Sequence, residues 1–175
     1  LFHTPSCEHP KEHKVLGFGA SVDTIKITPA ALSKIETQDD PLHIILWLFD
    51  HTDAEGLDLS NCIVSGDIIA KIANMDSLEV LRLSSCGLQP DALVPIGSSP
   101  AFQQKLRELH ANSNKFDLND TTALALLAFL EVLDLSYCKL QPGTLVPIGN
   151  SPAFQVILRE LHADHNKFSL NDTTA

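Results

Sequence analysis

The sequence predicts an α/β solenoid in which short parallel strands line one face and helices line the other. Three observations carry this prediction. A unit of 52 residues occurs twice, each unit contains a spaced pattern of leucines twice, and apolar stretches with helical spacing separate the leucine patterns. In such a chain each repeat buries its apolar side against its neighbours, so the repeats stack in a row.

The longer repetition relates residues 78–123 to residues 130–175. Of the 46 aligned pairs, 35 are identical. The stretch LRELHANSNKF, residues 106–116, returns as LRELHADHNKF, residues 158–168, with two letters changed. Close copies at a fixed spacing are the signature of a repeat architecture. We call these two copies, whose equivalent residues lie 52 positions apart, sister units.

Each sister unit divides into two shorter repeats that share one frame of apolar positions. In LEVLRLSSCGL, residues 78–88, leucines stand at positions 1, 4, 6 and 11, and a cysteine stands at position 9. The same frame fits residues 54–64, 106–116, 130–140 and 158–168, with cysteine or asparagine at position 9. A degenerate sixth frame, VDTIKITPAAL, fits residues 22–32.

The spacing inside the frame predicts the local structure. The L-x-L core alternates at period two, as a short strand with one buried face does. Because each repeat returns to the same place through a connecting segment, the strands must be parallel. Helical signals in the connecting segments are the apolar face of Ile68, Ile69 and Ile72 and a cap at Ser99. Asn119 or Asp120 is predicted to cap a further helix.

This frame resembles the leucine-rich repeat, L-x-x-L-x-L-x-x-N/C-x-L. Five successive matches cover residues 54–175, and their alternating steps of 24 and 28 residues are most similar to the ribonuclease-inhibitor-like subfamily. The resemblance implies a right-handed leucine-rich-repeat solenoid with parallel strands on its concave face and helices on its convex face. Residues 1–53 are then a non-repeat region, with the degenerate frame near 22–32, that caps the first apolar layer.

The last copy stops at residue 175, where its sister continues into a helix. We therefore expect about five repeats in residues 54–175, truncated at the C-terminal end. An uncapped apolar layer is also a surface through which the chain could self-associate.

Charge and composition narrow the class of partner. The formal net charge of −10 argues against nucleic acid, because phosphate binding needs a face rich in lysine and arginine. It argues equally against an anionic membrane surface, and no apolar stretch is long enough to span a bilayer. We expect buried thiols at position 9, which favour a reducing compartment and hence a cytoplasmic protein.

Neither catalysis nor a cofactor is expected. The sequence contains no nucleophile elbow, no H-E-x-x-H motif and no phosphate-binding loop, so we predict no enzyme and no catalytic residue. Near the N-terminus, His3, Cys7, His9 and His13 are residue types that bind metals, but their spacing fits no zinc signature. A polar tail is expected there, with a metal-regulated binding protein as the alternative.

Residues at one frame position form a column along the solenoid, because neighbouring strands lie about 4.8 Å apart. Position 2 reads Glu55, Glu79, Arg107, Glu131 and Arg159. From Glu79 onward the signs alternate, and we expect these residues to neutralise one another. At positions 5 and 8 the sister units differ, although their leucines do not. We therefore predict a partner-binding site on the concave face at Arg82, His110, Asp134, Tyr137, His162 and His165.

The expected function is that of a protein–protein interaction module whose partner the sequence does not identify. The alternative is a substrate-recognition adaptor of a ubiquitin ligase, or the recognition domain of a larger enzyme or effector. Residues 40–53, DPLHIILWLFDHTD, are similar in part to the core of an F-box, although the Leu-Pro order of that motif is absent.

Overall fold

A computed structural model describes residues 19–21, 24–36 and 54–168. The strands are β1 Gly19–Ser21, β2 Thr24–Lys26, β3 Gly56–Asp58, β4 Val80–Arg82, β5 Glu108–His110, β6 Val132–Asp134 and β7 Glu160–His162. The helices are α1 Pro29–Glu36, α3 Gly66–Ile72, α4 Val94–Ser98, α5 Pro100–Lys105, α6 Leu118–Leu124, α7 Val146–Gly149 and α8 Phe154–Ile157. The histidine and cysteine cluster of residues 3–13 and the F-box-like stretch of residues 40–53 lie outside the described residues.

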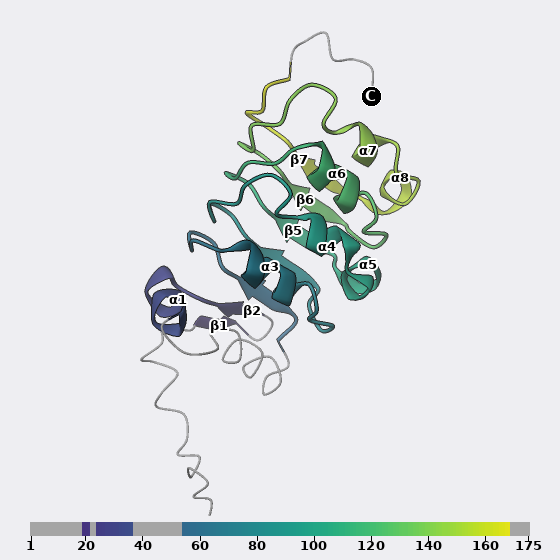
Figure 1. The fold of residues 1–175 in the computed structure, drawn as a ribbon. Helices are drawn as coiled ribbons and strands as arrows, with labels where there is room; N and C mark the ends of the chain where they lie inside the picture. The colour runs from purple at the N-terminus through teal and green to yellow at the C-terminus, as the bar shows by residue number, and fades with distance from the viewer. Residues whose placement is uncertain (1–18, 22–23, 37–53, 169–175) are drawn as a thin grey trace, which may run out of the picture.

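One sheet contains the seven strands in chain order, and helices α3, α4, α6 and α7 follow one another along one side of it (Figure 1). Strands β2 to β7 pair in parallel, whereas β1 pairs antiparallel with β2. The register brings the position-4 residues opposite one another at Ile25, Leu57, Leu81, Leu109, Leu133 and Leu161. The predicted fold class is confirmed, and β2 adds a parallel strand in the degenerate frame.

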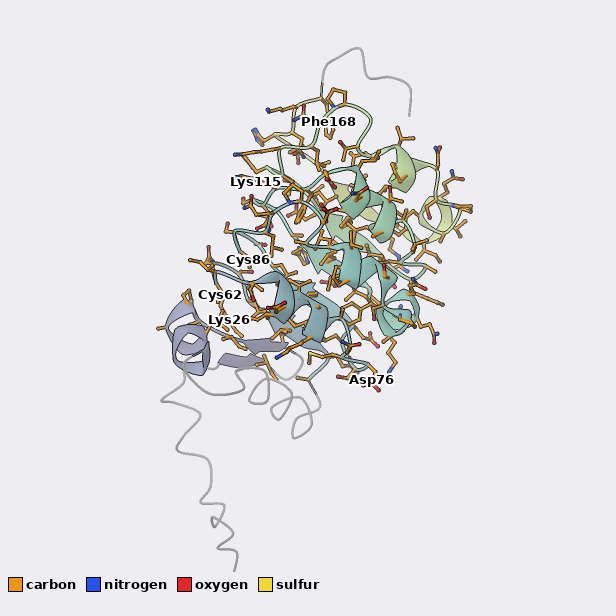
Figure 2. The ribbon with its side chains drawn as sticks, in the orientation of Figure 1. Lys26, Cys62, Asp76, Cys86, Lys115 and Phe168 are labelled. Atoms are coloured by element: carbon orange, nitrogen blue, oxygen red, sulfur yellow. The ribbon has the colours of Figure 1, made fainter. Side chains whose placement is uncertain are left out.

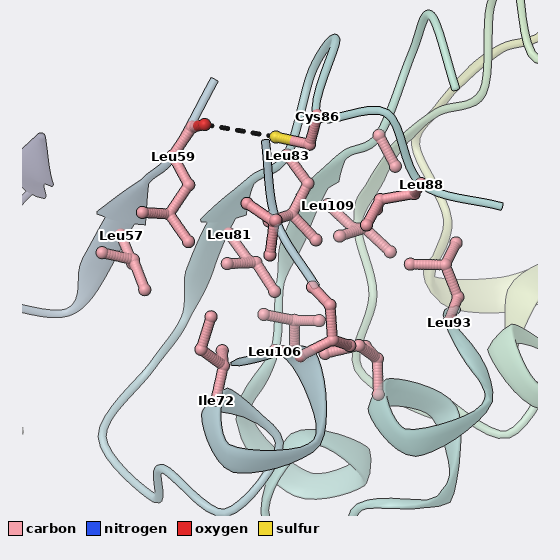
Figure 3. Packing of buried hydrophobic residues seen from close by; sticks show 14 of the residues in the cluster. Leu57, Leu59, Ile72, Leu81, Leu83, Cys86, Leu88, Leu93, Leu106 and Leu109 are labelled. Carbon is pink, nitrogen blue, oxygen red and sulfur yellow. Dashed lines mark hydrogen bonds between the residues drawn. The ribbon is translucent and has the colours of Figure 1, made fainter. Parts of the chain in front are cut away.

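A continuous apolar core lies between the sheet and the helices (Figure 3). The inward leucines Leu57, Leu81 and Leu109 are fully buried, and Ile72 of α3 packs into the same cluster. Burying one leucine side chain stabilises a fold by about 1.5–3 kcal/mol. Because the sister units carry the same leucines, each layer repeats the packing of the layer before it.

The last strand differs from the others in burial. Leu161 of β7 is 44% exposed, whereas its equivalents Leu109 and Leu133 are fully buried. Self-association through this layer stays a prediction, as does the division of the chain into residues 1–53 and 54–175.

Position 9 connects each turn to the neighbouring repeat. The thiols of Cys62, Cys86 and Cys138 are buried, as predicted. The Cys86 thiol donates to the carbonyl oxygen of Leu59 on the preceding repeat, at 3.2 Å (Figure 3). Burial raises the pKa of Cys86 to about 12 and that of Cys138 to about 11, so both thiols stay protonated donors at neutral pH.

Asparagine at position 9 both accepts and donates hydrogen bonds, whereas the cysteine thiol is a donor. The Asn114 Oδ1 atom accepts from the backbone N–H groups of Cys86 and Leu88, at 3.1 and 3.0 Å. Its Nδ2 atom donates to the carbonyl oxygens of Leu83 and Ala111, both at 2.8 Å. The asparagine of the last repeat forms the same four bonds. Each asparagine therefore satisfies two donors of the turn before it.

The N-cap of helix α6 lies two or three residues earlier than the sequence predicts. Its N-cap is Asp117, whose Oδ1 atom accepts from the N–H groups of Asn119 and Asp120. The carboxylate of Asp120 accepts in return from the N–H of Asp117 at 3.0 Å, which completes a capping box. The prediction of Asn119 or Asp120 as the cap was wrong, because three acceptor side chains lie close together here and each can cap a helix.

Asp120 is also the link between α6 and the preceding repeat. Its side chain is fully buried and accepts from the N–H groups of Leu93 and Asp91, at 2.8 and 3.1 Å. Burial raises the pKa of Asp120, although these N–H donors act in the opposite direction. The predicted cap of α5 is confirmed, since the Ser99 Oγ atom accepts from the N–H of Phe102 at 3.3 Å.

The sister units place different residues at two turn positions with the same left-handed backbone. Gly87 has a φ of 72° and its equivalent Lys139 a φ of 58°, while Asp91 has 70° and its equivalent Gly143 has 80°. Glycine adopts this conformation without steric cost, and other L-residues do not. Each sister unit therefore carries one strained turn residue that the other unit has replaced by glycine.

The hydrogen bonds at position 9 predict an asymmetric exchange. Cys86→Asn should leave the free energy of unfolding within about 1 kcal/mol, because asparagine already serves the equivalent position. Asn114→Cys should lower it by about 1–3 kcal/mol, because the N–H groups of Cys86 and Leu88 lose their acceptor in a buried turn. Cys86→Leu should cost a similar amount, since leucine cannot donate to Leu59. Urea denaturation measures all three, and equal losses for Cys86→Asn and Asn114→Cys would contradict this assignment.

The strained turn residue predicts a stabilising change. Lys139→Gly should raise the free energy of unfolding by up to about 1 kcal/mol, because the left-handed cost exceeds the extra chain entropy of glycine. The reverse change, Gly87→Lys, should destabilise by about the same amount. A Cβ atom at Gly87 would meet no atom within 4 Å, so the backbone alone sets this cost. Thermal melts of the two variants check this prediction. A melting temperature for Lys139→Gly below that of the wild type would contradict it.

Candidate functional site

The candidate site lies on the face of the sheet opposite helices α3, α4, α6 and α7, which we call the concave face. Positions 3, 5 and 7 of each repeat, which alternate with the leucine positions 4 and 6, form this face. In β4, β5 and β6 the central leucine is buried and the two flanking residues are partly exposed. The local alternation therefore turns every second side chain of a strand towards solvent, where a partner can reach it.

From Glu79 onward, the charged column at position 2 is neutralised within the chain, as predicted. The Arg107 guanidinium lies 3.0 Å from a Glu79 carboxylate oxygen and 2.9 Å from a Glu131 oxygen. Arg159 lies 3.1 Å from the other oxygen of Glu131. Exposed pairs of this kind contribute about 0–1 kcal/mol each, so their main effect is to leave little net charge on this column.

The N-terminal half of the concave face is also neutralised. Lys26 Nζ lies 3.2 Å from Asp58 Oδ2, and Arg82 lies 3.6 Å from a Glu108 oxygen. The other oxygen of Asp58 accepts from the backbone N–H of Ser60 at 2.9 Å. Burial acts to raise the pKa of Asp58, but the bonds from Ser60 and Lys26 outweigh it, and the pKa lies below its usual value.

The C-terminal half of the concave face carries acidic groups that face histidines. Within the described ranges, no lysine or arginine pairs with Asp134, Glu160 or Asp164. His162 Nε2 lies 3.4 Å from a Glu160 oxygen, and His110 Nε2 lies 3.4 Å from a Glu108 oxygen. At neutral pH this half therefore presents more negative than positive charge.

A second row of side chains, which we call the rim column, follows the ends of the strands at position 8. Every member has a left-handed backbone, with φ between 56° and 66°, although none is glycine. The members are Asn61, Ser85, Ser113, Tyr137 and His165. Figure 2 shows the labelled residues Cys62, Cys86 and Lys115, which are near neighbours of rim residues in the chain, along one edge of the molecule. The shared turn therefore carries five side chains to the same edge.

Tyr137 and His165 form an aromatic stack within the rim column. Their ring centroids lie 4.2 Å apart, and the rings are inclined by only 14°. The backbone N–H of Tyr137 donates to the carbonyl oxygen of Asp164 at 2.9 Å, which holds the two turns together. Tyr137 is 53% exposed even in this stack. A rigid, partly exposed aromatic surface of this kind is a typical anchor for a protein partner.

The structure brings the six predicted binding residues into two neighbouring rows. Arg82, His110, Asp134 and His162 align across β4 to β7 in the position-5 column, and Tyr137 and His165 stack in the rim column. Their role in binding stays a prediction.

Two acidic residues of the same surface are not among the six predicted binding residues. Asp164 is one of the positions at which the sister units differ, so this signal was available. The equivalent of Glu160 in the other unit is also a glutamate, Glu108, so comparing the units does not single it out. Only its position beside His162 in the structure does.

The helix side offers a different kind of surface. A groove of about 610 Å³ lies between α4 and α6 and is lined by residues that include Val94, Pro95 and Leu126. Gly97 allows the two helices to approach, because a Cβ atom there would lie 2.2 Å from the Ala123 backbone. This groove is mostly apolar and carries one charged residue, Asp91.

Other kinds of site find no support in the described part of the chain. Within it, no three histidine, cysteine, aspartate or glutamate side chains are placed to hold a metal ion together. No helix described there has the length and apolar character needed to cross a membrane.

Comparison with known proteins agrees with this geometry. The Leucine Rich Repeat family matches residues 129–151, which contain β6 and α7. The chain has the architecture of a leucine-rich-repeat protein. The matched segment begins one residue before the repeat that the leucine frame predicts at residues 130–140. No curated protein and no solved structure matches the chain.

Proposed function

We propose that this leucine-rich-repeat chain binds a protein partner on its concave face and rim column. Leucine-rich-repeat domains are generally protein-interaction modules, which supports the class of function. The observation that carries the proposal is the exposed stack of Tyr137 on His165, because the sister unit has serine at both positions. Large, rigid aromatic side chains are enriched among the residues that dominate binding energy.

The comparison of the sister units separates scaffold from surface. The buried leucines are the same in both units, so the differences in the exposed columns do not serve the core. Four of the differences lie on the concave face or the adjoining rim turn, and the rest lie in turns and connecting segments. The four replacements are Arg82 by Asp134, Ser85 by Tyr137, Asn112 by Asp164 and Ser113 by His165.

The expectations about catalysis, compartment, subfamily and a role as an adaptor remain proposals. We propose that the chain has no catalytic role, because its sequence contains no catalytic motif, and that it acts in a reducing compartment such as the cytoplasm, where buried thiols persist. The alternating repeat lengths support the ribonuclease-inhibitor-like subfamily. The F-box-like residues 40–53 favour the second candidate, a substrate-recognition adaptor of a ubiquitin ligase, in which the concave face would bind the substrate.

Two serine substitutions test the proposed face. Each of these variants, Tyr137→Ser and Phe129→Ser, replaces an exposed aromatic residue by the serine found 52 residues earlier in the chain, at Ser85 or Ser77. Tyr137 is 53% exposed and follows β6, whereas Phe129 is 46% exposed and precedes β6. We expect Tyr137→Ser to weaken binding by about 1–2 kcal/mol and Phe129→Ser to leave it unchanged.

The measurement begins with affinity capture from cell extract on the wild-type chain, followed by identification of the retained proteins. The affinity of a purified candidate for the wild type and for both variants is then compared by calorimetry. Thermal melts of the two variants control for folding. Equal affinity of the partner for Tyr137→Ser and for the wild type would place the binding site elsewhere.

A further inference from the structure

We infer that the C-terminal half of the concave face recognises a basic segment of its partner, with an arginine side chain held by Asp134 and the Tyr137–His165 stack. This inference rests on the proposed function and assigns the chemistry of the partner. Three observations support it: the distribution of described carboxylates that have no lysine or arginine partner, an ion pair made at the equivalent position of an earlier repeat, and the exposed aromatic stack.

The first observation is the charge along the concave face. In the N-terminal half, Lys26 and Arg82 each pair with a carboxylate of a neighbouring strand. Among the described residues of the C-terminal half, Asp134, Glu160 and Asp164 have no lysine or arginine partner. A surface with surplus carboxylates attracts a basic partner and repels an acidic one, which sets specificity as well as the rate of encounter.

The second observation is that the chain already binds a cation at the position of Asp134. At the equivalent residue Asp58, Oδ1 accepts from the N–H of Ser60 at 2.9 Å and Oδ2 pairs with Lys26 at 3.2 Å. Asp134 repeats the first half of this arrangement, since its Oδ1 accepts from the N–H of Ser136 at 2.9 Å.

The strands beside Asp134 supply no permanent cation at position 5. They carry His110 on β5 and His162 on β7 in register with it, where β2 supplies Lys26 to Asp58. The Oδ2 atom of Asp134 is therefore left for a cation from outside the chain. We place the measurement at pH 7.5.

The third observation selects arginine over lysine. A guanidinium is planar and weakly hydrated, so it stacks on an aromatic ring while its N–H groups bond to a carboxylate. The Tyr137 ring is half exposed and held by its stack on His165, and Asp164 precedes His165 in the same turn. An ammonium is strongly hydrated and makes no planar stack, so a lysine would gain less from this surface.

A single tyrosine makes the surface directly observable. The chain contains one tyrosine, so ring-¹³C tyrosine labelling gives one set of NMR signals, from Tyr137. The full chain is titrated at pH 7.5 with a capped peptide of five arginines separated by glycine and serine. We expect a saturable shift of the Tyr137 signals. A peptide with citrulline at every arginine, equal in shape but uncharged, should bind at least about tenfold more weakly.

Three single-charge substitutions locate the interaction. Asp134→Asn and Asp164→Asn each remove one carboxylate of the proposed surface, and Asn is the sister residue of Asp164. Asp76→Asn removes one exposed carboxylate from the loop between α3 and β4, and Figure 2 shows Asp76 at the edge opposite Cys62 and Cys86. We expect the first two to weaken arginine-peptide binding about three- to tenfold and the third to leave it unchanged.

The outcomes separate this inference from the proposed function. Equal binding of the arginine and citrulline peptides, no saturable shift, or equal losses in all three variants would overturn the assignment of a cationic partner. If the captured partner still depends on Tyr137 in that case, the proposed function stands without the charge assignment. If the partner binds Tyr137→Ser as well as it binds the wild type, the proposed function itself fails.

Discussion

The common register of the parallel strands is the constraint on which the rest of this structure depends. Each position-4 residue lies opposite its equivalent, from Ile25 on β2 to Leu161 on β7, without a shift. A shift of one residue would exchange the buried and exposed faces of a strand, so the apolar core enforces the register. Because the register is shared, every frame position becomes a straight column, and each column has its own chemistry.

The turns after the strands preserve that register at the edge of the sheet. Cysteine at position 9 donates one bond to the preceding repeat, whereas asparagine both donates to and accepts from it. The same turns hold the position-8 residues of the rim column in a left-handed backbone, although none of these residues is glycine. The rim column thus results from the hydrogen bonding of the turns, and it places Tyr137 and His165 at the edge of the sheet.

Scaffold and surface are separated in this chain because buried and exposed positions alternate along each strand. The sister units can keep identical leucines while exchanging Arg82 for Asp134 and Ser85 for Tyr137. The exchange changes the charge and shape of the concave face with little effect on the core. Asp58 pairs with Lys26, whereas Asp134 has no equivalent cation beside it in the described residues. One frame position therefore pairs within the chain in one repeat and does not in another, where we propose that it binds the partner.

The sequence by itself determined the parallel strands of the repeats, their order in the sheet, the buried thiols and the neutralised column of Glu79, Arg107, Glu131 and Arg159. These features follow from the alternation of apolar residues at period two and from the spacing of the repeats, both of which are read from the sequence alone. The sequence did not indicate the antiparallel strand β1. Only the tertiary structure decided that Asp117 caps α6 and that Asp120 bonds to the preceding repeat. It also decided which carboxylates lack a cation and that Tyr137 stacks on His165. The bonds of Asp120 and the aromatic stack join residues more than twenty positions apart, and the choice of cap depends on side-chain direction, which local sequence patterns do not specify.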